Sequence, residues 1–556
     1  MSIIVALKTL FNRCQNKEFR YSTWENLLKD QYIYWNSLKK ITSSSPNILI
    51  ATSLGGYNHG VLLESLLAVA LTLRGAKVDM LLCDELLPAC QLTKYPKISP
   101  EELTRNGQKR FCKDCFKNGN NLYRSLGINI YYYSQFVESI QKERAKNIAS
   151  TFQTEQIKNY KLDGLAVGEH AYAGTLRYFA RGDLEGEHLG SSVAKLYLES
   201  SLLAAFAINN LLNKCTYDAV CFHHGIYVPQ GLIGEVCRKR GIRVVNWNPS
   251  YRKNTFIFSH GNSYHHTMIS EKTNTWKNIK FTKDLERKTM DYLKSRWYGT
   301  EDWIWFHEKP VFELRQVEKK IGINFDKPTV GMLTNVMWDA QLHYKSNAFP
   351  NMLVWVIKTI EYFSKRKDLQ LAIRVHPAEV TGMISSRQPI ISEIKKYFKK
   401  IPNNVYIIPP DSNISTYAVI EKCNSIIIYN TKTGIEIAST GIPVIVAGEA
   451  WIRNKGFSKD AKSEKEYFDI LDTLPFKKRM NLVMLRRARK YAFHFFFRRM
   501  IPLPFFSSRE KFQFSLNLSD IKDLLPGNYL GLDVVCDGIL YNKPFIYPAE
   551  KYDQKP

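Results

Sequence analysis

Short apolar runs that alternate with helical patterns constrain the fold of this 556-residue chain more than any other feature. The run "NILIAT" (47–52) is typical of a buried strand, "VLLESLLAVALTLRG" of an apolar helix, and "AKVDMLLC" of the next strand. A strand–helix–strand unit of this kind builds a parallel sheet with a right-handed crossover. We therefore expect an α/β protein.

The alternation occurs in two sets, which predicts two parallel α/β halves joined by a linker. A polar and basic insertion interrupts the first set, and "YDAVCFHHG" (217–225) resumes it. The second set runs from "PTVGMLTN" to "IPVIVAG". The predicted parts are a helical N-terminal segment (1–45), a first domain (46–270) with an insertion at about 88–190, a helical linker (271–324), a second domain (325–480) and a basic aromatic C-terminal segment (481–556).

The C-terminal segment leaves two interpretations open. Its stretch "RRARKYAFHFFFRR" (486–499) mixes Arg and Lys with aromatic residues and holds no acid. Such a stretch is typical of a segment lying at an anionic bilayer surface, or of a core helix with basic ends. The formal net charge of +26 favours anionic partners without choosing among them. We found no run of the roughly 18 apolar residues that spanning needs. The expected location is cytoplasmic, with the inner face of the plasma membrane as a contact surface under the first interpretation.

Polar residues follow the strands of the second set, at the sheet edge where ligands of parallel sheets bind. Arg374 ends the run "LQLAIR", His376 follows it, and Glu379 comes shortly after Pro377, which restrains the backbone there. A His and an Arg at a strand end can hold a phosphate or a carboxylate. The alternative is a helix entry with a capped histidine.

A second cluster follows "NSIIIYN". Thr431, Thr433 and Gly434 stand where a helix begins, and exposed N–H groups and the positive helix end attract anions there. Glu436, in the first turn, can accept hydrogen bonds from ribose hydroxyls. This arrangement favours a nucleotide with phosphates, and the alternative is an ordinary Thr–Glu helix cap.

The stretches "RVHPAE", "TNVMWDAQLHYKSNAF" and "STYAVIEKCNSIIIYNTKTGIEIASTGIPVIVAGEAWIRNKGFS" resemble the bacterial capsule polysaccharide biosynthesis proteins, most specifically over about 325–460. That family includes Kdo-transferring glycosyltransferases with two Rossmann-like domains (the GT-B fold). The resemblance implies a nucleotide-sugar donor in the second domain, a glycan or lipid-linked acceptor in the first, and chemistry in the cleft between them. It does not resolve hexosyl from Kdo transfer. The donor-binding candidates are Arg374, His376, Glu379, Thr431, Thr433, Gly434 and Glu436.

Two residues are candidates for catalysis. Asp339 follows the strand "TVGMLTN", where a carboxylate can bind sugar hydroxyls, act as a base or stabilise positive charge on the anomeric carbon. It can equally cap the next helix. His59 lies in the turn "SLGGYNHG", and an imidazole there can take a proton from an acceptor hydroxyl. Substrate binding or a purely structural turn are the alternatives for His59.

The acceptor-binding candidates come from the first domain. The glycines of the turn "SLGGYNHG" allow a ligand to approach closely. Of the two histidines after the strand "DAVCF", at most one is expected to reach the cleft, because neighbours on a strand end face opposite ways. These candidates are Gly55, Gly56, Asn58, His223 and His224.

The cysteines raise a separate question about metal. Cys83, Cys90, Cys112 and Cys115 lie close in sequence, and the spacing of "CKDC" suits two ligands of one zinc ion. A structural zinc site and buried or free thiols are both open. The chain has no HExxH motif and no Walker-type Gly–Lys pair, so catalysis is expected to require no cofactor.

The function these features favour is a glycosyltransferase of bacterial capsule or surface polysaccharide synthesis. Alternatives are a nucleotide-sugar epimerase of the same fold and a non-catalytic protein that binds a polyanion. Nucleic acid is not an expected partner, because the sequence shows no nucleic-acid-binding module.

Overall fold

The structure is a computed structural model that describes residues 24–38, 45–298, 300–303, 310–340, 342, 344, 347–510 and 513–552. Of the predicted helical N-terminal segment, only residues 24–38 and 45 are described. They contain helix α2 (Tyr32–Leu38), whose Trp35 is buried against the first half of the protein. The remainder of that segment lies outside the described residues.

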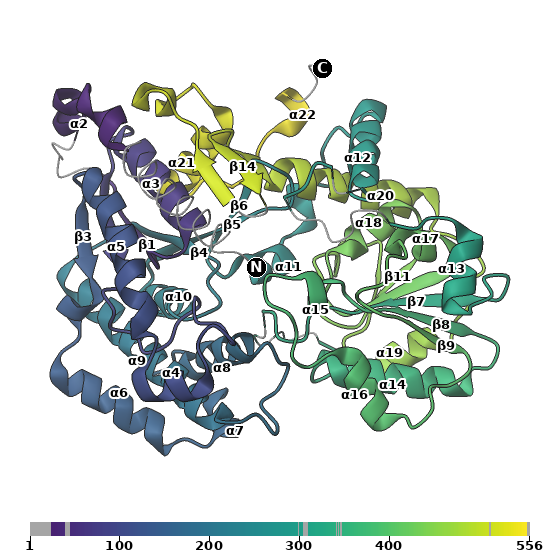
Figure 1. The fold of residues 1–556 in the computed structure, drawn as a ribbon. Helices are drawn as coiled ribbons and strands as arrows, with labels where there is room; N and C mark the ends of the chain where they lie inside the picture. Colours follow the sequence, from purple (N-terminus) through teal and green to yellow (C-terminus); the bar gives the residue numbers. More distant parts are fainter. Residues whose placement is uncertain are drawn as a thin grey trace, which may run out of the picture.

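The first half is built on a seven-stranded sheet with the order β13-β6-β5-β4-β1-β2-β3 (Figure 1). Strands β3, β2, β1, β4 and β5 are parallel, whereas at one edge β6 pairs antiparallel with β5 and β13 pairs antiparallel with β6. The strands are β1 (Asn47–Ser53), β2 (Lys77–Leu82), β3 (Asn129–Tyr132), β4 (Ala219–His223), β5 (Arg243–Pro249), β6 (Thr255–His260) and β13 (Ile501–Pro502).

The second half is built on a six-stranded, wholly parallel sheet with the order β12-β11-β10-β7-β8-β9. Successive residues of β10 pack on opposite faces, Ile426 and Ile428 on one and Ile427 on the other, so both faces are covered. The strands are β7 (Thr329–Leu333), β8 (Gln370–Arg374), β9 (Val405–Ile408), β10 (Ser425–Ile428), β11 (Val444–Val446) and β12 (Lys459–Asp460). Two parallel α/β halves are therefore present, as predicted.

Helices on both faces complete each half (Figure 1). Those of the first half are α3 (Asn58–Thr72), α4 (Pro100–Asn106), α5 (Lys109–Ser125), α6 (Ser139–Thr151), α7 (Thr154–Ile157), α8 (Val167–Phe179), α9 (Gly190–Lys214) and α10 (Gln230–Lys239). Those of the second half are α14 (Met352–Lys365), α15 (Ala378–Thr381), α16 (Ile390–Tyr397), α17 (Thr416–Lys422), α18 (Thr433–Ser439) and α19 (Glu464–Leu471).

The predicted insertion at about 88–190 is partly regular sheet. Strand β3 and helix α5 lie inside it, and β3 pairs in parallel with β2. The stretch "INIYYY" (128–133) around β3 is rich in strand-forming residues, so the sequence carried a signal for this partly buried edge strand that the expected insertion passed over. Helix α9 follows, and of the described helices it alone is long and apolar enough to cross a membrane. Its apolar window is 72% buried, as in a core helix.

The linker predicted at 271–324 contains helices α12 (Lys283–Ser295) and α13 (Leu314–Ile321), and helix α11 (Tyr264–Ser270) precedes it. Residues 299 and 304–309 lie outside the described residues. Tyr264 and Trp276 of this region are buried in the same apolar cluster as residues of the second half.

The C-terminal segment carries the chain from the second half back to the first. Helix α20 (Leu482–Phe493) continues as a π-helix (His494–Arg499), after which β13 pairs with β6 and α21 (Leu530–Tyr541) packs on α3. The hairpin β14 (Phe506–Glu510) and β15 (Gln513–Leu516) and helix α22 (Ala549–Tyr552) complete this segment.

The aromatic run of this segment is core. Tyr491, Phe493, Phe495 and Phe496 are 0% exposed, and Phe497 is 3% exposed. The core-helix interpretation is therefore confirmed, and these rings are not available to a bilayer. The segment is not a separate unit either, because it supplies an edge strand of the first sheet.

Replacing Phe496 with Ala should lower the free energy of unfolding by about 3–5 kcal/mol, because a fully buried ring leaves a cavity. Thermal or urea unfolding measures the change. A stability within about 0.5 kcal/mol of the wild type would contradict the burial of this run.

Candidate functional site

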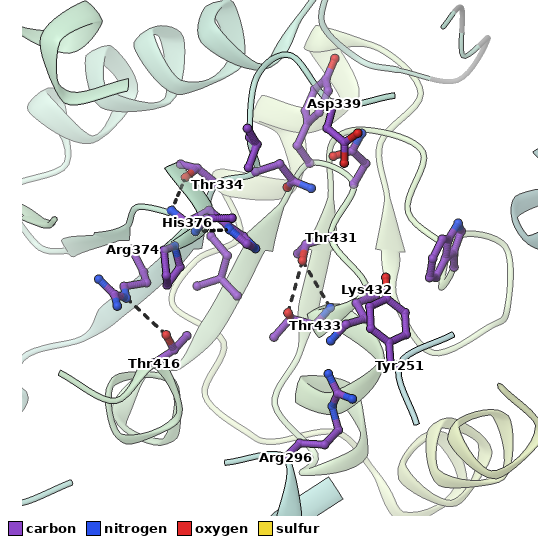
Figure 2. Close-up of a pocket in the computed structure, with 18 of the residues that line it drawn as sticks. Tyr251, Arg296, Thr334, Asp339, Arg374, His376, Thr416, Thr431, Lys432 and Thr433 are labelled. Atoms are coloured by element: carbon purple, nitrogen blue, oxygen red, sulfur yellow. Dashed lines mark hydrogen bonds between the residues drawn. The ribbon is translucent and has the colours of Figure 1, made fainter. Parts of the chain in front are cut away.

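A cavity of about 400 Å³ lies at the carboxyl ends of strands β7, β8 and β10 (Figure 2). Residues of the first half and the linker also line it, so both parts of the chain form its wall. From the second half come Thr334, Asn335, Asp339, Arg374, His376, Ser415, Thr416, Tyr417, Asn430, Thr431, Lys432, Thr433 and Trp451; from the rest of the chain come Tyr251, Tyr264, His265, Arg296, Trp297 and Asp302.

His376 is held in one orientation by backbone hydrogen bonds. Its N–H donates to Thr334 Oγ1 at 3.1 Å, and its ring Nδ1 accepts the N–H of Ala378 at 3.1 Å. Since Nδ1 is an acceptor, the neutral ring carries its proton on Nε2. Both interpretations of His376 therefore apply: it accepts a backbone N–H at the entry to the next helix, and it lines the cavity. Its ring brings an N–H donor to the cavity.

Arg374 also lines the cavity, but its guanidinium holds the neighbouring loop. Its side chain donates to the carbonyl oxygens of Pro409 and Ser412 and to Thr416 Oγ1, the last at 3.3 Å. Burial lowers the pKa of Arg374 to about 10. In this structure the residue shapes the wall that carries Thr416.

Thr431 and Thr433 lie together at the end of β10, as predicted. Thr431 donates to Thr433 Oγ1 at 3.3 Å, and the N–H of Thr433 donates to Thr431 Oγ1 at 3.4 Å. Lys432, between them, also lines the cavity, with its Nζ 4.4 Å from the centre of the Tyr251 ring. Two hydroxyls and one ammonium therefore meet on one short stretch.

Two donor-binding candidates have other roles. A Cβ on Gly434 would lie 2.6 Å from Ile428 Cδ1, so this glycine lets α18 pack against β10. Glu379 is 3% exposed and its carboxylate accepts the N–H of Ile390 at the start of α16. Burial raises the pKa of Glu379 to about 7. Neither residue lines the cavity.

Glu436 faces cations rather than the cavity, which corrects its predicted ribose role. Its carboxylate lies 3.2 Å from Arg296 Nε and 2.9 Å from Lys432 Nζ, and it accepts the Tyr417 hydroxyl at 2.5 Å. Burial favours the neutral acid, but Arg296 and Lys432 outweigh burial and hold the pKa of Glu436 at about 2. Both carboxylate oxygens of Glu436 therefore already have partners within the protein.

Arg296 is the main residue that sequence reasoning missed. It follows α12 in the linker, pairs with both Glu436 and Asp302, and lines the cavity. Arg296 does not follow a strand. The rule that ligand-binding residues lie at strand ends, which located His376, therefore could not identify it. Lys432 could have been found, because its spacing of four residues from Glu436 suits an ion pair on a helix.

Asp339 lines the cavity on the loop after β7, and Tyr227 of the first half holds it there. The Tyr227 hydroxyl donates to Asp339 Oδ1 at 2.9 Å and accepts the N–H of Ala340 at 3.0 Å. Burial and the Asp339 carboxylate together raise the pKa of Tyr227, which keeps this hydroxyl protonated. The contact joins the two halves across the cavity wall.

His59 does not line this cavity with Asp339 and His376. Its ring packs 4.3 Å from that of Phe514 and 5.8 Å from that of Tyr57, centre to centre. A Cβ on Gly55 would lie 2.1 Å from the carbonyl oxygen of Cys115, so this glycine admits helix α5.

The other residues of that turn also face α5. A Cβ on Gly56 would meet Leu92 and Cys115 at 3.1–3.3 Å, and Asn58 Oδ1 accepts from Asn118 Nδ2 at 3.4 Å. These glycines therefore allow helix α5 of the same chain, and not a ligand, to approach closely.

His223 and His224 differ as expected for neighbours on a strand end. His223 is buried, with Nε2 2.8 Å from Asn248 Oδ1 and 3.1 Å from the Tyr57 hydroxyl, and burial lowers its pKa to about 3. The His224 ring stacks on Tyr227 at 5.4 Å and lies 5.3 Å from Tyr264, a cavity residue. Only His224 lies directly behind the cavity wall.

For the four cysteines, the sequence left a structural zinc site and buried or free thiols open. Among the described residues, no three His, Cys, Asp or Glu side chains are grouped so as to hold a metal ion. The Cys90 thiol donates to Gln108 Oε1 at 3.2 Å, and Cys115 Sγ accepts the N–H of Gly56 at 3.0 Å. Burial raises the pKa of all four thiols.

Residues 298–485 match the model of the family described as capsule polysaccharide biosynthesis protein, which confirms the predicted resemblance. No curated protein matches this chain. Several solved structures are similar to this chain at low identity.

A Thermosulfurimonas dismutans KpsC, beta Kdo 2,4 transferase, is 12% identical with a TM-score of 0.32, covering 49% of this chain and 79% of that one. A Neisseria meningitidis UDP-GlcNAc 2-epimerase bound to UDP-GlcNAc is 11% identical with a TM-score of 0.26, covering 81% and 94%. The S. aureus MnaA–UDP structure is 9% identical with a TM-score of 0.27, covering 80% and 91%.

Replacing Glu436 with Gln should destabilise the protein by about 3–5 kcal/mol at pH 7, because it removes the carboxylate that two buried cations share and leaves Asp302 alone to balance Arg296 and Lys432. The folded pKa of about 2 lies below the value of about 4.3 for an unfolded glutamate. The stabilisation is therefore complete above pH ~4.5 and is lost as the pH falls toward 2.

Unfolding measured between pH 7 and pH 3 checks this, and the difference between wild type and variant should shrink at the acid end. Glu464→Gln, at a half-exposed pair with Lys358, is the matched control and should change stability by less than about 1 kcal/mol. A Glu436→Gln effect that stays constant with pH would contradict the ion cluster.

Proposed function

We propose that this protein is a glycosyltransferase of bacterial capsule or surface polysaccharide synthesis that uses a nucleotide-sugar donor and a glycan or lipid-linked acceptor. The observation that carries the proposal is the cavity at the carboxyl edge of the second sheet. There the His376 ring and the Thr431 and Thr433 hydroxyls come from the ends of β8 and β10, which flank β7, and residues of the first half close the opposite side. The match to the capsule family supports the same reading.

The donor's phosphates fit the second-half wall. His376 offers Nε2–H, and Thr431 and Thr433 offer hydroxyls, all groups that hydrogen-bond a phosphate oxygen. Arg296 and Lys432 pair with the two carboxylates of Glu436 and Asp302, so the cluster beneath is close to neutral. Recognition would therefore rest on directed hydrogen bonds, which strengthen as negative charge builds on the departing phosphate.

Transfer requires one bond to form and one to break. An acceptor hydroxyl oxygen bonds to the anomeric carbon, the bond from that carbon to the phosphate oxygen breaks, and its electron pair leaves with the nucleotide. The hydroxyl proton must pass to a base. Asp339, on the loop that meets the first half, is the carboxylate placed to take that proton or to stabilise the oxocarbenium-like carbon (Figure 2).

Incubation with a panel of nucleotide sugars and oligosaccharide or lipid-linked acceptors tests the proposal. Donor hydrolysis or transfer supports it. Interconversion of the sugar without transfer would identify an epimerase instead. Salt-sensitive retention on a polyanion without any turnover would identify a binding protein.

His376→Ala should weaken nucleotide binding by about tenfold or more, because a hydrogen bond to a charged phosphate is lost. Calorimetric titration with the nucleotide that the panel identifies measures the change. His188→Ala is the matched control, since the His188 side chain is 72% exposed and lies outside the cavity. Equal affinities for the two variants would remove His376 from the donor site.

Asp339→Asn should reduce turnover by about 100-fold or more, since general-base catalysis contributes at least that much. Donor affinity should change little, because the proposed donor contacts lie on the other strand ends. Asp326→Asn, an exposed aspartate before β7, serves as control in the same turnover assay. Normal turnover by the Asp339 variant would show that the carboxylate takes no part in the chemistry.

A further inference from the structure

The start of helix α20 holds two adjacent aliphatic side chains in water. Leu482 is 82% exposed and Val483 is 78% exposed, and they are the first two residues of the helix. Asn481 caps this end by accepting the N–H of Met484 at 2.9 Å. The far end of the helix is anchored, because Tyr491 and Phe493 are fully buried. The apolar pair is thus rigidly presented.

The surface around this pair is basic. The chain has no Asp or Glu from 473 to 490, and five cations there are exposed. Arg479 donates to the backbone carbonyls of Cys423 and Glu421, and Arg486 to that of Phe281, so these contacts leave their charges uncompensated. The exposed cations are Lys477, Lys478, Arg479, Arg486 and Arg487.

Two acidic residues of the neighbouring helix α12 have partners of their own. Helix α12 lies beside α20 (Figure 1), and its Glu286 is paired with Arg489 at 2.7 Å. Asp284 of the same helix is paired with Arg287 at 2.9 Å. Both carboxylates therefore have their own partners, and a basic surface remains around the exposed pair.

We infer that the α20 start, defined as residues 477–487, docks on an anionic lipid surface. Leu482 and Val483 would enter the boundary between headgroups and acyl chains, and the surrounding cations would meet the lipid phosphates. Nucleic acid or an acidic polysaccharide also matches the charge, but neither offers an apolar phase to the aliphatic pair. The site lies N-terminal to the aromatic run that is buried in the core, and is distinct from it.

Sedimentation with vesicles tests this inference. Wild-type protein should bind vesicles of phosphatidylcholine with phosphatidylserine and should bind pure phosphatidylcholine far less. The double variant Leu482→Ser/Val483→Ser should lose about tenfold or more in affinity for the anionic vesicles. Its Tm should stay at the wild-type value, since both side chains lie in water.

The matched control is Val380→Ser/Met383→Ser, which removes a valine and a methionine that are 52% and 67% exposed outside the basic surface. It should bind the anionic vesicles as the wild type does. Wild-type binding by the Leu482/Val483 variant, or an equal loss in both double variants, would overturn the inference.

The charge is tested separately. Lys477→Ala/Lys478→Ala should weaken binding to anionic vesicles by ~5-fold for each lysine. Lys399→Ala/Lys400→Ala removes the same charge from another exposed pair and should have less effect. If the Lys477/Lys478 variant loses binding to a single-stranded oligonucleotide while the Leu482/Val483 variant keeps wild-type vesicle binding, the surface is a polyanion site and the lipid assignment is wrong.

Discussion

The buried ion cluster around Glu436 and Arg296 is the interaction on which the arrangement of the cavity depends. Arg296 comes from the linker, Glu436 and Lys432 from α18 and the turn before it, and Asp302 from the chain beyond α12. The Arg296 guanidinium also lies 5.5 Å from the ring centre of Tyr251 and 5.3 Å from that of Phe496. One side chain thus joins the first half, the linker, the second half and the C-terminal return.

This cluster explains how a cavity lined by both halves keeps its shape. A buried charge without a partner costs several kcal/mol, so movement that separates Arg296 from Glu436 is resisted. The Tyr227 hydroxyl between Asp339 and Ala340 adds a second tie on the opposite wall. The strand ends that carry His376, Thr431 and Thr433 therefore face a fixed partner surface.

Local patterns predicted much of this structure. Alternating strand and helix signals located both sheets, and parallel strands bring their carboxyl ends to one edge. For that reason Asp339, His376, Thr431 and Thr433 do meet at one cavity. Neighbouring side chains at a strand end face opposite ways, and the two histidines do so: His223 is buried beside Asn248, whereas His224 lies behind the cavity wall, against Tyr227.

Contacts between residues far apart in the sequence determined the features that local patterns did not predict. Nothing near Glu436 in the sequence shows that Arg296, 140 positions earlier, occupies its carboxylate. The glycines at 55 and 434 look like ligand-facing turns, yet a helix or strand lies where the ligand was expected.

The central claim is that the cavity binds a phosphorylated carrier. The most direct measurement is the Tm of the wild-type protein in the presence of nucleoside mono- and diphosphates and of the matching nucleosides, since a ligand that binds only the folded state raises it. At least one nucleotide should raise the Tm in a concentration-dependent way while its nucleoside does not. Equal protection by nucleoside and nucleotide, or no protection by any nucleotide, would contradict a phosphate site at His376, Thr431 and Thr433.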